Sequence, residues 1–256
     1  MPHIHLSEFS IEHPESVPSK QRNGLCDDDW IEHLKSRVGP EQRSVAWFAA
    51  RINRITCSDI AAVIGLNPYS DSERVLRKKL KIESFSGNVA TKHGQDNEDN
   101  AIACYERVYK KKVIDFDFGL QCHPVHDRIA GSPDGITDDC ILIEIKCPLR
   151  RKIKPGIMPL YYVPQVLFLL EIFDLKLAHY VEYVPPSRTR CEEIQVIEIR
   201  RAPAWVGKQV PKLLQFVERL RQLRKVDYAP AISRWVPKKL ECKPKELEYR
   251  VYRFVF

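Results

Sequence analysis

Apolar and polar residues alternate with a period of two along two stretches in the second half of the chain, KLAHYVEYV (176–184) and EEIQVIEIR (192–200). This alternation is typical of strands with two different faces, and it predicts two neighbouring strands of one sheet. A third stretch, ILIEIKC (141–147), is apolar on both sides and predicts a buried strand. Weaker strand patterns are found at 113–118, at 128–130 and in the closing YRVYRFVF, which we expect at a sheet edge.

Helical patterns surround these strands. We expect helices from Asp27, from Arg43, from Ser58 to a stop at Gly65, and over 73–82 with Ser70 or Asp71 as the cap. A longer helix is predicted over 92–110, a buried one over 164–173 and an amphipathic one over 210–226. Helices that alternate with strands in this way predict a mixed α/β domain.

The ends of the chain differ in composition from its middle. Residues 1–26 are polar and lack periodicity, which predicts a loose N-terminal arm, and residues 229–256 form a tail rich in proline and lysine. We therefore expect one domain over residues 27–228.

Composition narrows the class of protein. The 256 residues are 44% hydrophobic, which is enough for one sizeable core, and 41 Lys and Arg against 34 Asp and Glu favour a polyanionic partner. No run reaches the roughly 20 apolar residues that a membrane span needs, and the first residues do not resemble a secretory signal. The eight cysteines lack CxxC spacing. Together these features predict an intracellular protein with reduced thiols and no membrane partner.

The buried strand pattern at 141–147 carries two charged residues. Because side chains alternate between faces, Glu144 and Lys146 share one face, while Ile145 points to the other. A buried charge is costly unless it is paired or binds something. Asp134 lies ten residues earlier in a Ser-Pro-Asp-Gly turn, and two carboxylates with a strand carbonyl suit Mg²⁺. The alternative is a Glu–Lys pair on the solvated face of an edge strand.

The motif of Asp134, Glu144 and Lys146 resembles the PD-(D/E)xK nuclease core, and GSPDG…IEIKCP is similar to the bacteriophage lambda exonuclease / YqaJ-type viral recombinase family. The segments WFAARINRITCSDIAAVIGLNPYSD and YYVPQVLFLLEIF resemble the same family. The resemblance covers residues from about 47 to 183 and implies a restriction-endonuclease-like fold, in which a central mixed sheet is flanked by helices.

The resemblance also implies roles for single residues. Asp134, Glu144 and the carbonyl of Ile145 would bind Mg²⁺, as two ions for which Mn²⁺ can substitute, and Lys146 would be the catalytic lysine. Glu98 matches a helix glutamate beside the metals. Its spacing from Ile102, Tyr105 and Tyr109 separately places it on an apolar helix face, where a glutamate at the edge could also simply reach water.

Three further residues, Gln165, Arg51 and Ser58, also match positions of the family. Gln165 matches a glutamine near the catalytic water, although the second glutamine that often follows is Leu167 here. Arg51 and Ser58 match a 5′-phosphate pocket, and Ser58 at a helix start with a bidentate arginine suits an anion. A plain helix cap and a surface charge explain them equally well.

A basic run directly follows the strand that carries Glu144. Because of this position, we expect its side chains to line the DNA path and to contact phosphates without reading sequence. Its members are Arg150, Arg151 and Lys152.

These features together predict a Mg²⁺-dependent exonuclease that degrades one strand of double-stranded DNA in the 5′→3′ direction from a 5′-phosphorylated end. By family analogy we expect a role in recombination or processing of viral DNA, with a single-strand-annealing protein as a partner, in the host cytoplasm or nucleus. The alternatives are an endonuclease on the same core and a non-catalytic DNA-binding protein. The sequence does not indicate whether the chain forms homo-oligomers.

Overall fold

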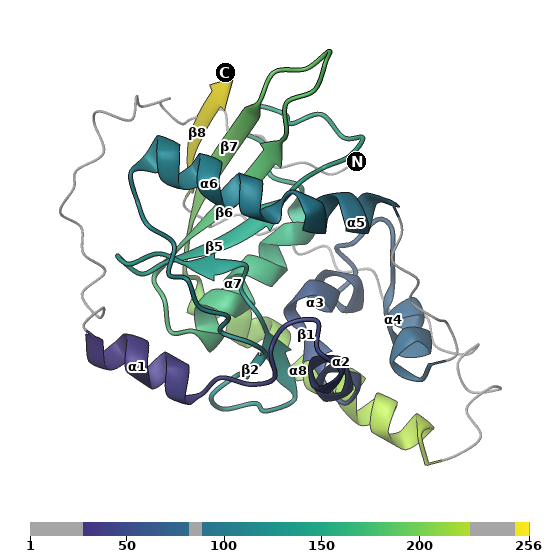
Figure 1. The fold of residues 1–256 in the computed structure, drawn as a ribbon. Helices are drawn as coiled ribbons and strands as arrows, with labels where there is room; N and C mark the ends of the chain where they lie inside the picture. Colours follow the sequence, from purple (N-terminus) through teal and green to yellow (C-terminus); the bar gives the residue numbers. More distant parts are fainter. Residues whose placement is uncertain (1–27, 82–88, 226–248, 256) are drawn as a thin grey trace.

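The computed structural model describes residues 28–81, 89–225 and 249–255. A five-stranded sheet forms its centre, in the order β4-β5-β6-β7-β8 (Figure 1). Strand β5 pairs with β6 in parallel, and the other neighbours are antiparallel. The strands are β4 (Gly135–Ile136), β5 (Ile141–Lys146), β6 (Leu177–Val184), β7 (Glu193–Arg200) and β8 (Tyr249–Val255). The predicted pair at 176–184 and 192–200 and the predicted edge strand are therefore confirmed.

A second, smaller sheet lies below the first in Figure 1 and has the order β1-β3-β2. Strand β1 is parallel to β3, and β2 is antiparallel to it. Its short strands are β1 (Ile55–Thr56), β2 (Gln121–Cys122) and β3 (Ile129–Gly131).

Helices cover both faces of the large sheet (Figure 1). In chain order the helices are α1 (Asp28–Ser36), α2 (Val45–Ile52), α3 (Cys57–Val63), α4 (Ser72–Lys79), α5 (Val89–Asp96), α6 (Glu98–Tyr109), the 3₁₀ helix η2 (Leu160–Tyr162), α7 (Val163–Ile172) and α8 (Pro203–Leu223). Helix α6 packs on one face, and α7 packs on the other with α3 and α8 behind it.

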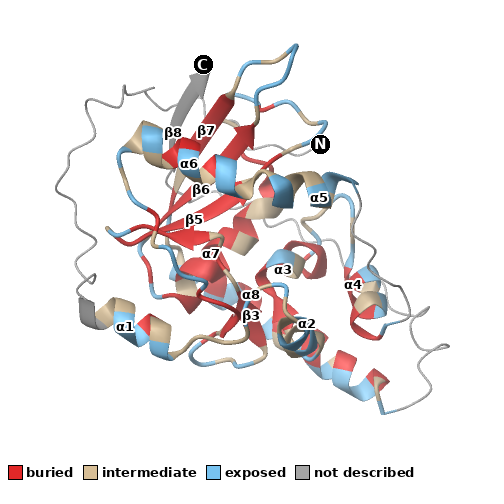
Figure 2. Cartoon of the chain, in the orientation of Figure 1, coloured by how far each residue is buried: buried red, intermediate tan, exposed pale blue. Residues whose placement is uncertain are grey.

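Helix α7 is the crossover between the parallel strands β5 and β6, a connection that two parallel neighbours require. Its sequence is apolar on nearly all sides, and it is buried accordingly (Figure 2). Gly131 allows a close approach nearby, since a Cβ there would lie 2.6 Å from both Cys57 Sγ and a methyl group of Leu169. The start of α3 is thereby brought against β3 and α7, next to the strand that carries Glu144.

Four expected elements differ in the structure. The helix predicted over 92–110 is two helices, α5 and α6, which meet at Asn97. The stretch 113–118 forms no regular strand and contributes only an isolated bridge from Val113 to Thr137. Helix α3 begins at Cys57, so Thr56 rather than Ser58 precedes it. Helix α8 begins at Pro203, seven residues before its amphipathic pattern becomes clear at residue 210.

Five cysteines of the described residues are free thiols, as expected: Cys57, Cys104, Cys122, Cys147 and Cys191. Cys140 is disulfide-bonded, so the expectation of reduced thiols is wrong at that position. In the described part of the chain, no helix is both long and apolar enough to span a membrane. The N-terminal arm at 1–26 and most of the predicted tail lie outside the described residues, and the domain limits stay a prediction.

Candidate active site

Strand β5 positions Glu144 and Lys146 on one face of the sheet. Leu142, two residues before Glu144, belongs to the core around α7, whereas Ile143 and Ile145 belong to the core under α6. Glu144 is fully buried on the α7 side, and the Lys146 side chain retains 22% exposure. The predicted division of faces is therefore confirmed, and the buried strand rules out a solvated edge.

Asp134 reaches the same strand from the turn before β4. Its backbone N–H donates to the Ile143 carbonyl at 3.2 Å, and its Oδ2 accepts the Ile145 N–H at 2.6 Å. These two bonds hold the Asp134 carboxylate beside β5. The Ser-Pro-Asp-Gly turn thus presents Asp134 as expected.

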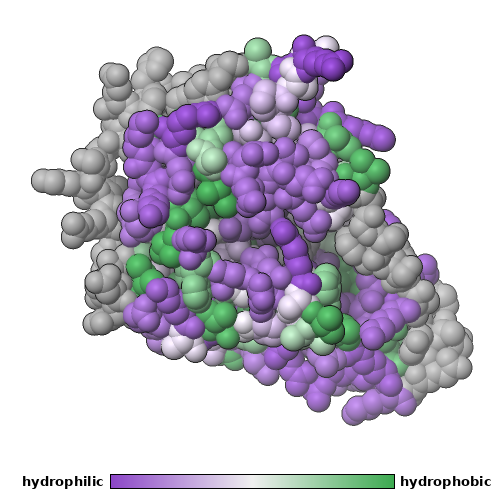
Figure 3. Space-filling view, in the orientation of Figure 1, coloured by the Kyte–Doolittle hydropathy of each residue, from purple (hydrophilic) through white to green (hydrophobic). Residues whose placement is uncertain are grey.

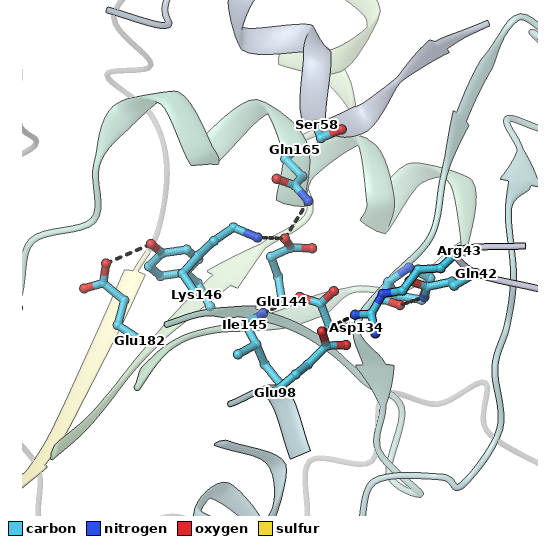
Figure 4. A network of polar contacts seen from close by, with 12 residues as sticks. Gln42, Arg43, Ser58, Glu98, Asp134, Glu144, Ile145, Lys146, Gln165 and Glu182 are labelled. Carbon is cyan, nitrogen blue, oxygen red and sulfur yellow. Dashed lines mark hydrogen bonds and ion pairs between the residues drawn. The ribbon is translucent and has the colours of Figure 1, made fainter. Parts of the chain in front are cut away.

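The carboxylate of Glu144 is the centre of the polar network in Figure 4. Its Oε1 accepts hydrogen bonds from Lys146 Nζ and from Gln165 Nε2 on α7. Its Oε2 is buried and has no partner among the described residues. Burial, and next the negative charge of Asp134, raise the pKa of Glu144 to about 8. Burial alone would lower the pKa of Lys146, but Glu144 and Asp134 outweigh it and raise that pKa.

Glu98 joins this group from the first position of α6, which begins after the break at Asn97. Burial, and then the charge of Asp134, raise the pKa of Glu98, while Arg43 opposes the shift. Arg43 Nη2 forms an ion pair with Glu98 Oε2 at 2.6 Å. Figure 4 shows Arg43 and Gln42 approaching Glu98 and Asp134 from the side opposite to Lys146.

The carboxylates of Asp134, Glu144 and Glu98 have the chemistry to bind a hard divalent cation. Oxygen ligands are those that Mg²⁺ prefers, and the unpartnered Glu144 Oε2 and the mutual repulsion of the carboxylates both call for positive charge. Within the described residues, however, no group of three or more His, Cys, Asp or Glu side chains is already arranged to hold an ion. Lys146 and Arg43 instead supply cations to Glu144 Oε1 and Glu98 Oε2, while Glu144 Oε2 stays without a partner among the described residues.

Arg51 and Ser58 are brought together by the fold. Arg51 Nη2 lies 3.3 Å from both Ser58 Oγ and Thr56 Oγ1, and its guanidinium stacks on Trp47 at 3.9 Å from the ring centroid. The Arg51 guanidinium and the exposed Ser58 hydroxyl, held together in this way, can grip a phosphate. Ser58 also lines the cavity that contains Lys146 and Gln165, so its hydroxyl opens onto the same space as Glu98 and Asp134.

An ion pair between the buried Lys79 and the half-buried Asp59 supports Arg51. Lys79 Nζ, on a side chain that is 9% exposed, lies 3.0 Å from Asp59 Oδ2 and donates to the Arg51 carbonyl at 3.0 Å. Asp59 also accepts a hydrogen bond from Thr56 Oγ1 at 2.7 Å. Burial alone would raise the pKa of Asp59, but Lys79, Arg51 and the Thr56 hydroxyl outweigh it and lower that pKa.

The basic run after β5 divides into two kinds of side chain. Arg150 and Lys152 are exposed, as DNA contacts require. Arg151 instead forms an ion pair with the fully buried Glu182 of β6, which also accepts the Tyr180 hydroxyl at 2.9 Å. Arg151 still lines the cavity that contains Lys146. Its prediction as a plain phosphate contact missed this structural role.

Sequence reasoning also missed residues that contact the turn of Asp134 from the N-terminal side. Gln42 Nε2 donates to the Pro133 carbonyl at 2.9 Å, and Trp47 Nε1 donates to Ser132 Oγ at 3.0 Å. The only local signal was the apolar character of α2, none of whose side chains is buried. Exposed apolar residues on a short helix suggest a contact with something, but not which contact.

The cavity in front of β5 has a volume of about 780 Å³ and collects most of the predicted site residues. Among them are Ser58, Glu98, Asp134, Lys146 and Gln165. The face drawn in Figure 3 is hydrophilic over most of its area, with small hydrophobic patches that include the region of α2. A hydrophilic hollow that contains both acidic and basic side chains is suited to a charged substrate.

Several known proteins are similar to this chain in sequence or in fold. A model of the YqaJ-like viral recombinase domain matches residues 46–175. A protein of African swine fever virus is 30% identical over 170 residues, which are 50% of this chain and 45% of that protein. An uncharacterized protein of Acanthamoeba polyphaga mimivirus is 28% identical over 189 residues, 66% of this chain and 34% of that protein. The chain thus spans about half the length, or less, of these curated relatives.

Two solved structures have the same fold. An alkaline exonuclease from Laribacter hongkongensis superposes with a TM-score of 0.55 at 24% identity, over 74% of this chain and 98% of that one. A phage-related exonuclease from Haemophilus somnus superposes with a TM-score of 0.53 at 16% identity, over 67% and 95%. The expected restriction-endonuclease-like core is thereby confirmed. Because the family model matches half of its residues, the chain belongs to the YqaJ-like viral recombinase domain family.

Proposed function

We propose that this protein is a metal-dependent deoxyribonuclease that degrades one strand of double-stranded DNA in the 5′→3′ direction from a 5′-phosphorylated end. One observation carries the proposal: a single cavity contains Asp134, Glu98, Lys146 and Ser58, and Ser58 is held by Arg51. Asp134, Glu98 and Lys146 supply the parts of a hydrolytic centre. Ser58 and Arg51 supply a binding site for a phosphate. The related fold of two proteins that are named exonucleases supports the same activity.

The ligands of the cation would be Asp134, Glu144, Glu98 and the Ile145 carbonyl. In the proposal Mg²⁺ is the ion, in two copies, and Mn²⁺ substitutes for it. When bound there, Mg²⁺ would offset the carboxylate charge and polarise the scissile phosphate. The buried Glu144 Oε2, which has no described partner, supports this assignment.

Lys146 and Gln165 orient the reacting groups in this proposal. Both side chains converge on Glu144 Oε1, so each is held by a defined hydrogen bond. Lys146 supplies positive charge to the phosphate as negative charge develops there. Gln165 presents its amide where it can hold a water molecule for in-line attack. The protein thus contributes placement and charge, which are the main requirements of phosphodiester hydrolysis.

Polarity of digestion would come from Arg51. Both strands offer the same phosphodiester, so direction requires a group that recognises a chain end. A terminal 5′ phosphate carries more charge than an internal one, and the Arg51 guanidinium with the Ser58 hydroxyl would favour it. Lys79, paired with Asp59, would keep Arg51 in place by donating to its backbone carbonyl.

Membership of a viral recombinase family supports a role in recombination or processing of viral DNA within the infected cell. A nuclease that removes one strand exposes the other as single-stranded DNA. We therefore propose a single-strand-annealing protein as the partner that binds this single-stranded DNA.

The test is digestion of linear duplexes of one sequence with a 5′ phosphate or a 5′ hydroxyl, in Mg²⁺ and in Ca²⁺. We expect mononucleotides from the 5′ end in Mg²⁺, faster with the phosphate, and no release in Ca²⁺. Arg51→Ala should slow the phosphorylated duplex by about 10- to 100-fold and leave the hydroxyl duplex almost unchanged.

Arg54→Ala is the matched control, since the Arg54 guanidinium donates to the backbone carbonyls of Asp127 and Ala50 and its loss should not alter the ratio of the two rates. A covalently closed plasmid should stay intact. Cleavage of that plasmid would support the endonuclease alternative, and release of nucleotides from 3′ ends would contradict the proposed direction.

A further inference from the structure

Two cavities meet at the candidate active site. One has a volume of about 780 Å³ and the other about 650 Å³, and Glu98 and Asp134 line both. A DNA strand that passes these carboxylates could in principle occupy either side. The side chains that line the two cavities decide between them.

The smaller cavity does not suit a polyanion. Its described lining includes five carboxylates besides Glu98 and Asp134, against two cationic side chains, Arg43 and Lys112. The additional carboxylates are Glu41, Asp99, Glu106, Asp115 and Asp117. Like charges repel a phosphate backbone, so the cleaved strand is excluded from this side.

The larger cavity is far less acidic. Apart from Glu98 and Asp134, the described residues that line it include no carboxylate, and Lys146 and Arg151, each in an ion pair, place two cations in its wall. Three tyrosines, Tyr69, Tyr161 and Tyr162, complete this wall. The combination of cations and aromatic rings is typical of grooves that bind single-stranded nucleic acid.

The three rings form a continuous series from Lys146 to the cavity mouth. Lys146 Nζ lies 5.4 Å from the Tyr162 centroid, Tyr162 packs on Tyr161 at 4.4 Å, and Tyr161 packs edge to face on Tyr69 at 5.6 Å. Tyr69, the outermost, is 56% exposed. A nucleotide whose phosphate lies near Lys146 therefore has aromatic surface beside it for its base.

The backbone at both ends of this series is well held. Tyr161 and Tyr162 form η2 and continue directly into α7, which is buried throughout the core. The Tyr69 N–H donates to Asn67 Oδ1 at 2.9 Å, and Arg74 Nη1 donates to the Tyr69 carbonyl at 3.3 Å. Rings on an ordered backbone lose little conformational entropy when a base stacks on them.

We propose that Tyr69 and Tyr161 form a stacking site for an unpaired base of the strand that is cleaved. This inference rests on the proposed nuclease function and specifies its substrate: the cavity accepts a single nucleotide next to the scissile phosphate. Its volume is that of a small-molecule pocket rather than of a duplex. Because every base has a π-face, the site is tolerant of sequence.

The test measures binding in Ca²⁺, without digestion, of two 5′-phosphorylated duplexes that each end in a short unpaired 5′ stretch. One carries normal bases, and the other carries abasic residues at the unpaired positions. The wild-type protein should bind the first about 10-fold more tightly, the typical value of one stacking contact. Tyr69→Ala should lose this preference by weakening only the first complex, and Tyr69→Phe should retain it.

Phe116→Ala is the matched control, because Phe116 is a partly exposed aromatic residue that lines the acidic cavity instead. It should leave the preference unchanged. Equal binding of the two duplexes by the wild-type protein, or equal weakening of both by Tyr69→Ala, would overturn the stacking site. Digestion of the normal duplex in Mg²⁺ separately tests the nuclease itself, so failure of one proposal is distinguishable from failure of the other.

Discussion

Trp47 Nε1 donates a hydrogen bond to Ser132 Oγ at 3.0 Å, and the same ring supports the Arg51 guanidinium at 3.9 Å. One side chain of α2 therefore contacts both the turn that presents Asp134 and the arginine proposed to hold the 5′ phosphate. In the proposed nuclease, the relative placement of these two parts would determine which phosphodiester reaches the carboxylates.

This double contact separates two variants. Trp47→Phe keeps an aromatic face for Arg51 but removes the donor to Ser132, so we expect a slower reaction with an unchanged preference for the 5′ phosphate. Trp47→Leu removes both and should also reduce that preference, since a cation–π contact contributes about 0.5–1 kcal/mol or more. Rates on phosphorylated and hydroxyl duplexes measure both effects. An equal preference in the two variants would show that the ring does not orient Arg51.

Removal of carboxylate charge should abolish cleavage without unfolding the protein. Asp134→Asn keeps an oxygen for the Ile145 N–H, and Glu144→Gln keeps one for Lys146 and Gln165, but each loses charge that Mg²⁺ requires. We expect at least a 100-fold loss of rate with little change in DNA affinity measured in Ca²⁺. Cleavage at a tenth of the wild-type rate by either variant would contradict the metal assignment.

Arg150 and Arg151 should behave differently although they are neighbours. Arg150→Ala removes an exposed charge, so the slope of log K against log salt should flatten by about one unit, with stability unchanged. Arg151→Ala leaves Glu182 buried without its cation and should destabilise the protein by about 3–5 kcal/mol.

A double variant tests the cause of that loss. Arg151→Ala with Glu182→Gln should be more stable than Arg151→Ala alone, because the unpaired charge is removed. Denaturant midpoints measure this. If Arg151→Ala proved as stable as the wild type, the ion pair would not contribute to the stability of the protein.

Asp59 should make a contribution to stability that is lost at acidic pH. Its pKa is lowered in the folded state, so its stabilisation is present above the ordinary value of about 3.9 and is lost as the pH falls through the lowered folded value. Asp59→Asn should therefore be less stable than the wild type at pH 7, by about 3 kcal/mol because Lys79 stays buried.

The gap should narrow as the pH falls below about 4, because Asp59 of the unfolded chain takes up a proton there, whereas Asp59 of the folded protein does so only at its lower pKa. Denaturation at pH 7, 4 and 3 measures this dependence. Asp127→Asn serves as the control, since that side chain is 78% exposed and should change stability little at any pH. A stability difference that is independent of pH would indicate that Asp59 acts through packing alone.

Local sequence determined the central part of the site. The apolar residues around Glu144 and Lys146 can only be satisfied by a buried strand, and strand geometry then places both side chains on one face. The Ser-Pro-Asp-Gly turn likewise determined where Asp134 is presented, because proline and glycine restrict the backbone within a few residues. These constraints act over short distances, so they are legible without the fold.

Contacts between distant segments were decided only by tertiary structure. The sequence pattern predicted one helix over 92–110, yet the chain breaks at Asn97 and places Glu98 at the start of α6, beside Asp134. The stretch 113–118 alternates like a strand, but in the fold it forms only an isolated bridge at Val113. Its propensity for a strand therefore did not determine its pairing.

The residues that pair with Arg151 and with Trp47 could not be predicted from the sequence. Arg151 appears in the sequence as one of several basic residues after a strand, and only the parallel pairing of β5 with β6 brings it near Glu182. Trp47 and Ser132 are 85 positions apart, and their hydrogen bond follows from the packing of α2 against the smaller sheet and its turn. The sequence determined which side chains are present and which local face they occupy. The tertiary structure decided which charges neutralise each other, because an ion pair depends on distance in space and not along the chain.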